Sequence, residues 1–285
     1  CRGHLSVPYK IKFKGDYTLI RRPVVAGQFY PQTEASLRKM LSGLIESVAE
    51  KQEAMGVIMP HAGYVYSGYV AGLTISKVAL KKTVIILGTN HTGAGERFSI
   101  MTNGSWMTPM GEVKIDVEIA EAILKESQLL KEDALAHMYE HSIEVELPFI
   151  QYLASDTRIV PIVISQGKLS EYQKLGEDIA RGFKKVGRSG LFMASTDMTH
   201  YESKEAAQEK DRLAIDAVLA LDEERLFNTV KANDISMCGV APTCALISLC
   251  KNLGAAKAGL VKYQTSGDTS GDYSSVVGYA GMIIL

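Results

Sequence analysis

Three of the six histidines in the chain come shortly after runs of apolar residues. They are His61, His91 and His200. Ligands of open parallel sheets bind in the crevice at the carboxyl ends of the strands, so three neighbouring parallel strands would bring these imidazoles together. Imidazole is the commonest protein metal ligand and the usual acid or base near neutral pH. One histidine after a strand is more often a hydrogen-bonded loop residue, but the shared position of all three favours a metal or acid–base site.

Cys238 is the cysteine best placed to join such a site. It stands just before an expected helix, and a helix N-terminus lowers the pKa of a thiol and favours the thiolate. A thiolate is a soft ligand that suits iron, copper or zinc. The alternative interpretation is a buried small apolar residue, the usual position of a free cysteine. Cys244 and Cys250 fit that alternative, because they fall inside the helical pattern.

Acidic residues near two histidines are open to more than one interpretation. Asp197 stands three residues before His200. It could accept the ring N–H of a histidine and fix its tautomer, or cap the turn after the strand. Glu140 and Glu144 fall on one face of an expected helix, but no second histidine follows His141 four residues later, as a zinc-protease helix requires. We interpret this segment as a solvated helix start, from which His141 and Glu144 could still line the site.

The runs that precede the histidines are predicted to be strands of one α/β sheet. Strands are expected at Gly56–Met59, Thr83–Leu87, Arg158–Ile164, Leu191–Thr196, Gly259–Gln264 and Ser275–Ile284. His61 and His91 are 30 residues apart, which is the length of one βαβ unit. A right-handed crossover would therefore place the first two strands side by side and parallel. Phe98–Thr102 and Gly111–Ile115 are expected to form a hairpin.

Helical periodicity fills the intervals between these strands. Helices are expected at Thr33–Ala49, Ser67–Leu80, Val117–Ser127, His141–Ala154, Ser170–Val186, Lys204–Ala220, Asp222–Lys231 and Thr243–Lys251. Asp116 could cap the third of them, and Pro148 is expected to kink or break the fourth. The alternation predicts an α/β fold with a single mixed sheet covered by helices on both faces. Residues 1–21, with one possible strand around Tyr9–Phe13, are predicted to be an N-terminal extension, and residues 22–285 one domain.

The composition limits the partners and the compartment. The chain has 285 residues, 46% hydrophobic and 22% charged, and a net charge of −1, so neither nucleic acid nor an anionic membrane surface is expected as a partner. Four cysteines, of which Cys1 is the first residue, do not form a disulfide framework in so long a chain. No apolar run reaches the roughly 18 residues of a membrane span, and no signal-peptide pattern is present. We expect a cytoplasmic protein with reduced thiols.

Six blocks of the sequence resemble the Memo family, whose prokaryotic members are often called AmmeMemoRadiSam system protein B. The blocks are Pro60–Tyr64, Gly88–His91, Glu140–Phe149, Ser195–Tyr201, Cys238–Gly239 and Ser275–Ala280. They follow one another in the family's order from about Arg22 to the C-terminus. The resemblance implies a fold like that of the class III extradiol dioxygenases, which cleave catechol rings with non-haem Fe(II). The family name also implies a pathway link to radical-SAM proteins.

The resemblance implies roles for particular residues. His61 and His91 would be metal ligands, His200 the acid–base histidine, and Cys238 the third ligand where the dioxygenases have a glutamate. Asp197 would orient His200. A thiolate in place of a carboxylate changes the charge and the redox behaviour of the metal. Ring cleavage therefore does not follow from the fold.

Three functions remain open at this stage. The first is a redox metalloenzyme of unknown substrate, with Fe(II) as the expected metal and copper or zinc as alternatives. The second is a module that binds a small molecule or a peptide, in which Tyr64 and Tyr201 near the site could stack on the ligand. The third is a protein that handles iron or copper, since two histidines and one cysteine suit Cu(I).

Overall fold

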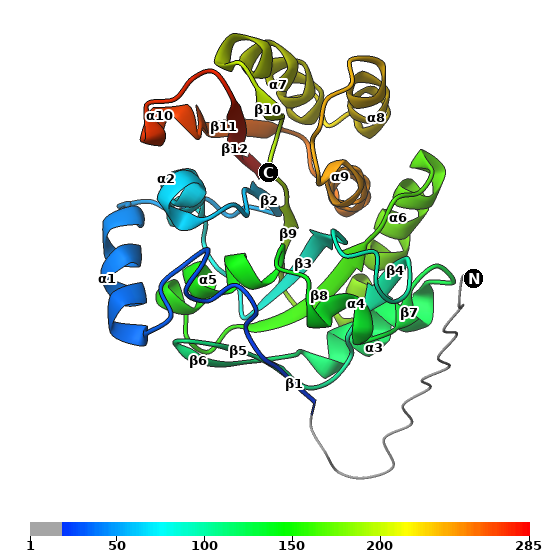
Figure 1. The fold of residues 1–285 in the computed structure, drawn as a ribbon. Helices are drawn as coiled ribbons and strands as arrows, with labels where there is room; N and C mark the ends of the chain where they lie inside the picture. Colours follow the sequence, from blue (N-terminus) through cyan, green and yellow to red (C-terminus); the bar gives the residue numbers. More distant parts are fainter. Residues whose placement is uncertain (1–18) are drawn as a thin grey trace, which may run out of the picture.

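The structure, a computed structural model, describes residues 19–285 (Figure 1). Cys1 and the expected strand around Tyr9–Phe13 lie outside the described residues. Strand β1 (Ile20–Arg21) pairs in parallel with a strand of the domain. Strand β1 thus consists of two residues that the sequence analysis assigns to the extension.

The centre of the molecule is one mixed sheet of nine strands. Its order is β10-β12-β2-β9-β3-β8-β4-β7, and β11 pairs with β12. The bounds are β2 (Gly56–Met59), β3 (Thr83–Thr89), β4 (Phe98–Ile100), β7 (Lys131–Glu132), β8 (Arg158–Ile164), β9 (Leu191–Ser195), β10 (His200–Glu202), β11 (Ala258–Thr265) and β12 (Val276–Ile284). The middle strands are almost wholly buried, as expected of a parallel sheet covered on both faces.

The expectation that β2 and β3 are neighbours is wrong. Both are parallel, as predicted, but β9 lies between them and pairs with each. The length of a βαβ unit fixes the parallel direction of its two strands, whereas the number of strand positions that the crossover skips depends on tertiary packing. The carboxyl ends of β2, β9 and β3 still meet at one edge of the sheet.

The expected hairpin is also wrong in its partners. Phe98–Ile100 forms β4, which pairs antiparallel with β8 in the main sheet. The hairpin instead joins β5 (Ser105–Thr108) to β6 (Gly111–Lys114), with Gly111 at φ +108° after the turn. With β1 these two strands form a separate three-stranded sheet, an addition to the main sheet that the sequence did not indicate.

Helices cover both faces of the main sheet (Figure 1). Their bounds are α1 (Glu34–Leu44), α2 (Tyr64–Ser76), α3 (Val117–Glu126), α4 (Leu135–Met138), α5 (Leu147–Leu153), α6 (Leu169–Val186), α7 (Lys204–Leu219), α8 (Glu223–Ala232), α9 (Val240–Leu253) and α10 (Gly267–Ser270). Helices α3, α6 and α9 pack together, and α1, α2 and α5 form another group. The mixed α/β fold with a helix-covered sheet is confirmed. Asp116 caps α3 as predicted, since its side chain accepts from Ile119 N.

The segment before α5 differs from the predicted helix. A short 3-10 turn, η1 (Glu144–Glu146), leads directly into α5, and Pro148 stands in the first turn of α5. Proline is tolerated there because the first N–H groups of a helix have no intrahelical partner. The expected kink or break is therefore wrong, since Pro148 stands at the start of a helix and interrupts none. Within residues 19–285, no helix is both long and apolar enough to cross a membrane.

A buried ion pair joins the first described residues to this segment. Arg21 and Glu144 are both wholly buried and hydrogen-bonded to each other. The guanidinium also donates to the carbonyl oxygens of His137 and Glu140, and it lies 4.4 Å from the ring centroid of Trp106. Glu144 accepts the backbone N–H groups of Val24 and Val25 as well.

We predict that Arg21→Met destabilises the protein by about 3–5 kcal/mol, because it leaves the Glu144 carboxylate buried without its cation. The measurement is the free energy of unfolding in urea. Arg38→Ala is the matched control, since the Arg38–Glu34 pair is exposed and such pairs contribute about 0–1 kcal/mol. Equal losses in the two variants would contradict the prediction.

Candidate metal centre

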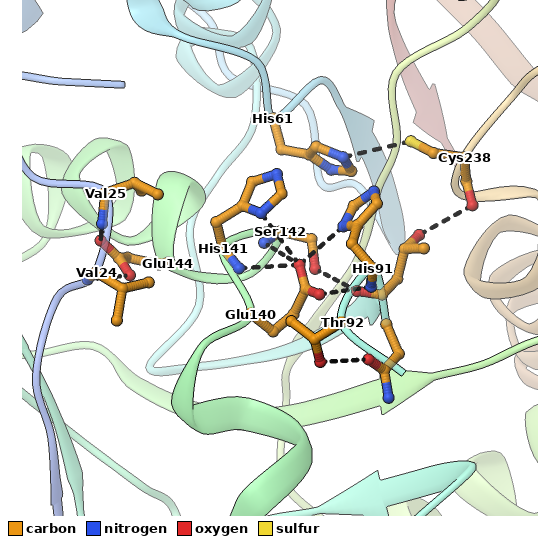
Figure 2. A network of polar contacts seen from close by, with 12 residues as sticks. Val24, Val25, His61, His91, Thr92, Glu140, His141, Ser142, Glu144 and Cys238 are labelled. Carbon is orange, nitrogen blue, oxygen red and sulfur yellow. Dashed lines mark hydrogen bonds and ion pairs between the residues drawn. The ribbon is translucent and has the colours of Figure 1, made fainter. Parts of the chain in front are cut away.

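His61 stands two residues past the end of β2 and is 2% exposed. Its ring nitrogen Nδ1 lies 2.7 Å from Oγ of Ser195, the last residue of β9. Its other ring nitrogen, Nε2, lies 3.3 Å from Sγ of Cys238 (Figure 2). Burial, together with the neighbouring His141 and His91, lowers the pKa of His61 well below its usual value. The imidazole is therefore neutral at neutral pH.

His91 stands two residues past the end of β3 and is held by Glu140. Its backbone N–H donates to Oε2 of Glu140 over 2.6 Å, and Nδ1 lies 2.9 Å from Oε1. Burial opposes ionisation of Glu140, but hydrogen bonds from His91 and Ser142 outweigh it and hold the pKa of this carboxyl at about 2. An ionised Glu140 accepts Nδ1–H, so Nε2 of His91 is left free for a ligand.

Cys238 reaches the two histidines from the start of α9. Gly239 permits this approach, because a Cβ there would lie only 2.3 Å from Cβ of Thr196. The sulfur accepts the N–H of Asp197 over 3.2 Å. Burial and the nearby Asp197 raise the pKa of the thiol to about 12. Burial outweighs the hydrogen bonds that act to lower this pKa, so the thiol is protonated in the metal-free protein, contrary to the expected thiolate.

These three residues form a group that could hold a metal ion. Ligand atoms of His61, His91 and Cys238 all lie within 4.8 Å of one another. A tetrahedral zinc ion lies about 2.3 Å from a thiolate sulfur and about 2.0 Å from an imidazole nitrogen, so these two ligand atoms are about 3.5 Å apart. The distance between Sγ of Cys238 and Nε2 of His61 is close to this, at 3.3 Å. The donor set fits a soft or borderline metal. The His91 side chain is 32% exposed, so one side of the group faces solvent.

A second cluster, His91, Glu140 and His141, also has ligand atoms within 4.8 Å. Its carboxylate is already occupied. Glu140 accepts two hydrogen bonds from His91 and one each from the backbone N–H groups of His141 and Ser142. Glu140 therefore orients the loop and the His91 ring in the metal-free protein. Gly88 leaves room for the side chains of Ser142 and Ile143 against β3, because a Cβ there would lie 2.6 Å from Oγ of Ser142.

His141 lies beside both histidines of the group (Figure 2). Its ring stacks on His91 with centroids 4.7 Å apart and meets the His61 ring edge-on at 5.5 Å. The side chain is 23% exposed. Burial lowers the pKa of His141, which keeps its imidazole neutral near the metal group.

His200 and Asp197 are arranged differently from the prediction. His200 begins β10 and is five residues past the end of β9. Its Nδ1 is buried and has no hydrogen-bond partner among residues 19–285. Asp197 accepts the backbone N–H of His61 over 2.9 Å, so its expected role of orienting His200 is corrected. Asp197 instead fixes the turn that carries His61.

The buried environment of Asp197 affects its charge. Burial raises the pKa of Asp197 to about 7, although the backbone N–H groups of His61 and Ala62 act against this shift. Burial likewise lowers the pKa of His200. Burial thus favours the uncharged form of both groups, because it raises the pKa of the acid Asp197 and lowers the pKa of the base His200.

Two residues expected to line the site lie in the core. Tyr64 is 2% exposed and donates its hydroxyl to the carbonyl of Val145. Glu144 is fully buried against Arg21. Both corrections have one cause, since a polar group without solvent needs a partner inside the protein. Tyr201, by contrast, is 77% exposed, and its ring centroid lies 5.8 Å from that of His200.

Sequence reasoning missed Ser195 and Glu146 and misinterpreted Glu140. Glu140, Glu144 and Glu146 are all wholly buried, whereas the sequence indicated a solvated helix start. The available signal was three glutamates interleaved with apolar residues in a segment that ends in an apolar run. No local pattern identified Ser195, because its hydrogen-bond partners are distant in the chain.

Comparison with known proteins identifies relatives over almost the whole chain. The family described as Memo-like protein matches residues 21–283. MEMO1 family protein MK0963 of Methanopyrus kandleri is 44% identical over 277 residues, which cover 92% of this chain and 98% of that protein. MEMO1 family protein MTH_45 of Methanothermobacter thermautotrophicus is 40% identical over 274 residues, which cover 92% of this chain and 99% of that protein.

One solved structure shows the same fold. It is the uncharacterized protein JW3007 from Escherichia coli K12, with a TM-score of 0.50 and 10% sequence identity over 80% of this chain and 98% of that one. At this identity the likeness concerns the fold alone. The family match and the identity to the two relatives show that the chain belongs to the Memo family.

Proposed function

We propose that this protein is a redox metalloprotein that holds one divalent metal ion, Fe(II), between His61, His91 and Cys238. The observation that carries the proposal is the 3.3 Å approach of Nε2 of His61 to Sγ of Cys238. Each histidine has its Nδ1 engaged by a buried side chain, Ser195 or Glu140. This is how metal-binding histidines are usually oriented, with the other ring nitrogen left for the ion.

The donor set and the open side favour iron. Two histidines and one anionic ligand with open positions are typical of non-haem Fe(II) oxygenases, and here the anion is a thiolate. When bound, Fe(II) would supply one-electron chemistry and open positions for a substrate and dioxygen. His200 is the proposed acid–base group, because burial keeps its imidazole neutral. Asp197, with a pKa raised to about 7 by burial, is a second group that can hold a proton near the site.

Other residues, three exposed tyrosines, favour a second candidate, the binding of a peptide or small molecule. Tyr66 and Tyr69 are exposed residues of α2, the helix that follows His61, and Tyr201 is an exposed residue next to His200 in β10. Such rings stack on aromatic or cationic ligands. A role in iron or copper handling would need the metal group alone. Metal content separates the first candidate from a binding module, and oxygen uptake with substrate separates it from metal handling.

We predict that anaerobically purified protein reconstituted with Fe(II) holds about one iron per chain, and that His61→Ala and Cys238→Ser lose most of it. Metal analysis after desalting is the measurement. Cys244→Ser is the matched control, because Cys244 is buried and donates to the carbonyl of Glu223, a role that serine can take over. Full iron content in Cys238→Ser would exclude the proposed ligand set.

Metal affinity should rise with pH. The pKa of about 12 keeps the Cys238 thiol protonated in the metal-free protein, so binding must release one proton. The lowered pKa of His61 means that this histidine releases none. Asp197, which also lies at the site, has a pKa of about 7, so the measurement is made above that pH. Between roughly pH 7.5 and 9 we expect the affinity for Zn(II) to rise about tenfold per pH unit. Competition with a chelator measures it, and Cys238→Ala should flatten the slope. A flat profile in the wild type would show that no thiolate binds.

Removal of the carboxylate behind His91 should weaken metal binding. We predict that Glu140→Gln lowers the affinity for Fe(II) by about 10–100-fold, because the carboxylate that fixes Nδ1–H and raises ligand basicity is lost. Glu223→Gln is the matched control, since Glu223 is 6% exposed and lies in α8, outside the metal group. If both variants bind Fe(II) like the wild type, Glu140 has no orienting role.

A further inference from the structure

The hydroxyl of Ser195 has three polar partners at short distance. Its Oγ lies 2.7 Å from Nδ1 of His61, 2.7 Å from the carbonyl oxygen of Ser142 and 2.8 Å from Oε1 of Glu146. A hydroxyl has one hydrogen and two lone pairs. It can therefore donate to only one of these partners and must accept from the other two.

The carbonyl of Ser142 decides which partner receives the hydrogen. A carbonyl oxygen can only accept, so Ser195 donates to Ser142. His61 must then donate through Nδ1–H, and Glu146 must donate through a carboxyl O–H. If Glu146 were a carboxylate that accepted the Ser195 hydrogen, the 2.7 Å contact between Ser195 and the Ser142 carbonyl would join two acceptors and be repulsive.

We propose that Glu146 is held as a neutral carboxylic acid and that, together with Ser195, it positions His61 as the Nδ1–H tautomer with Nε2 directed at the metal group. The proposal rests on the proposed function for its consequence at the metal, but the tautomer and the protonation state belong to the metal-free protein. Glu146 and Ser195 are positioning residues, since neither lies in the group that could hold the ion.

The surroundings of Glu146 support the neutral acid. The side chain is wholly buried, and Oε2 has no hydrogen-bond partner among residues 19–285. No lysine or arginine in that part of the chain forms a salt bridge with it. An unpaired carboxylate in such a place is far more costly than a carboxylic acid with one free carbonyl oxygen. Burial and the nearby Asp197 raise the pKa of Glu146 well above its usual value, in agreement with the hydrogen-bond count.

The two histidines of the metal group thus differ in the charge behind them. His91 donates to the ionised Glu140, which makes it the more basic ligand. His61 donates to the neutral hydroxyl of Ser195, which in turn accepts from the neutral carboxylic acid of Glu146. The protein therefore places one full negative charge behind His91 and none behind His61, although a glutamate lies near each.

Two measurements on metal-free protein test the protonation state and the tautomer. Infrared difference spectra between wild type and Glu146→Gln at pH 8 should contain the C=O stretch of a protonated carboxylic acid. In ¹⁵N spectra of histidine-labelled protein, the His61 signals, assigned by their loss in His61→Ala, should be those of the Nδ1–H tautomer. A carboxylate band alone, or the Nε2–H tautomer, would overturn the proposal.

Metal binding supplies the third measurement. We expect Ser195→Ala to lower the affinity for Zn(II) by about 10–100-fold. The matched control is Ser99→Ala, because Ser99 is a buried strand serine 2.9 Å from Nε2 of the buried His137 and donates to a backbone carbonyl. Equal affinities of Ser195→Ala and Ser99→Ala would contradict the positioning role.

Glu146→Gln is the conservative variant. Its amide N–H can donate to Ser195 in place of the acid O–H, and no charge is removed. Glu146→Gln should therefore bind Zn(II) like the wild type, unlike Ser195→Ala. A fall of about tenfold or more would mean that a carboxylate acts there, against the proposal. If the wild type binds no Zn(II) or Fe(II), the proposed metal function fails, while the infrared and ¹⁵N results still decide the state of Glu146 and His61.

Discussion

Three carboxyl groups are buried within the seven residues Glu140–Glu146, and the site depends on how each of them is accommodated. A carboxylate without solvent is very costly unless it is paired, hydrogen-bonded or protonated. Glu140 is ionised and accepts several N–H groups, and Glu144 pairs with Arg21. Glu146 faces the Ser195 hydroxyl, with no cation in contact among residues 19–285. One short segment therefore holds the His91 loop, the first described residues and the end of β9 in fixed relation.

This segment lies at the carboxyl ends of the parallel strands, where its glutamates contact His91 and Ser195. β2 and β3 deliver His61 and His91 to the edge, but the strands alone leave the imidazole rings free to rotate. Ser195 and Glu140 fix the rings by their Nδ1 atoms. Both Nε2 atoms are then left for the side on which Cys238 lies, where Asp197 fixes the sulfur and the His61 backbone together.

Family and fold set limits on what this arrangement does. Membership of the Memo family follows from identity over almost the whole chain, and the likeness to the E. coli structure extends to the fold. Neither supplies a reaction, because one fold carries many chemistries. The donor atoms themselves support metal binding, in particular the 3.3 Å approach of Nε2 of His61 to Sγ of Cys238, and a bound cation would displace the proton of the neutral thiol.

Local sequence patterns determined much of this protein. Apolar runs predicted the buried strands β2, β3, β8 and β9, and His61 and His91 each stand two residues past the end of one of them. The family resemblance added Cys238 to the same group, which the structure brings together. Such predictions succeed because strand period, strand length and motif spacing are properties of a few consecutive residues.

Tertiary structure decided the rest. It inserted β9 between β2 and β3, buried Glu140 where a solvated helix start was expected, and turned Asp197 toward the His61 backbone instead of the His200 ring. It also made the Cys238 thiol a weak acid, although its place before a helix suggested the opposite. The physical reason is common to all four. Burial and hydrogen-bond partners are set by residues that are distant in the chain, such as Ser195 and His61, and no local pattern encodes which distant groups meet in the folded protein.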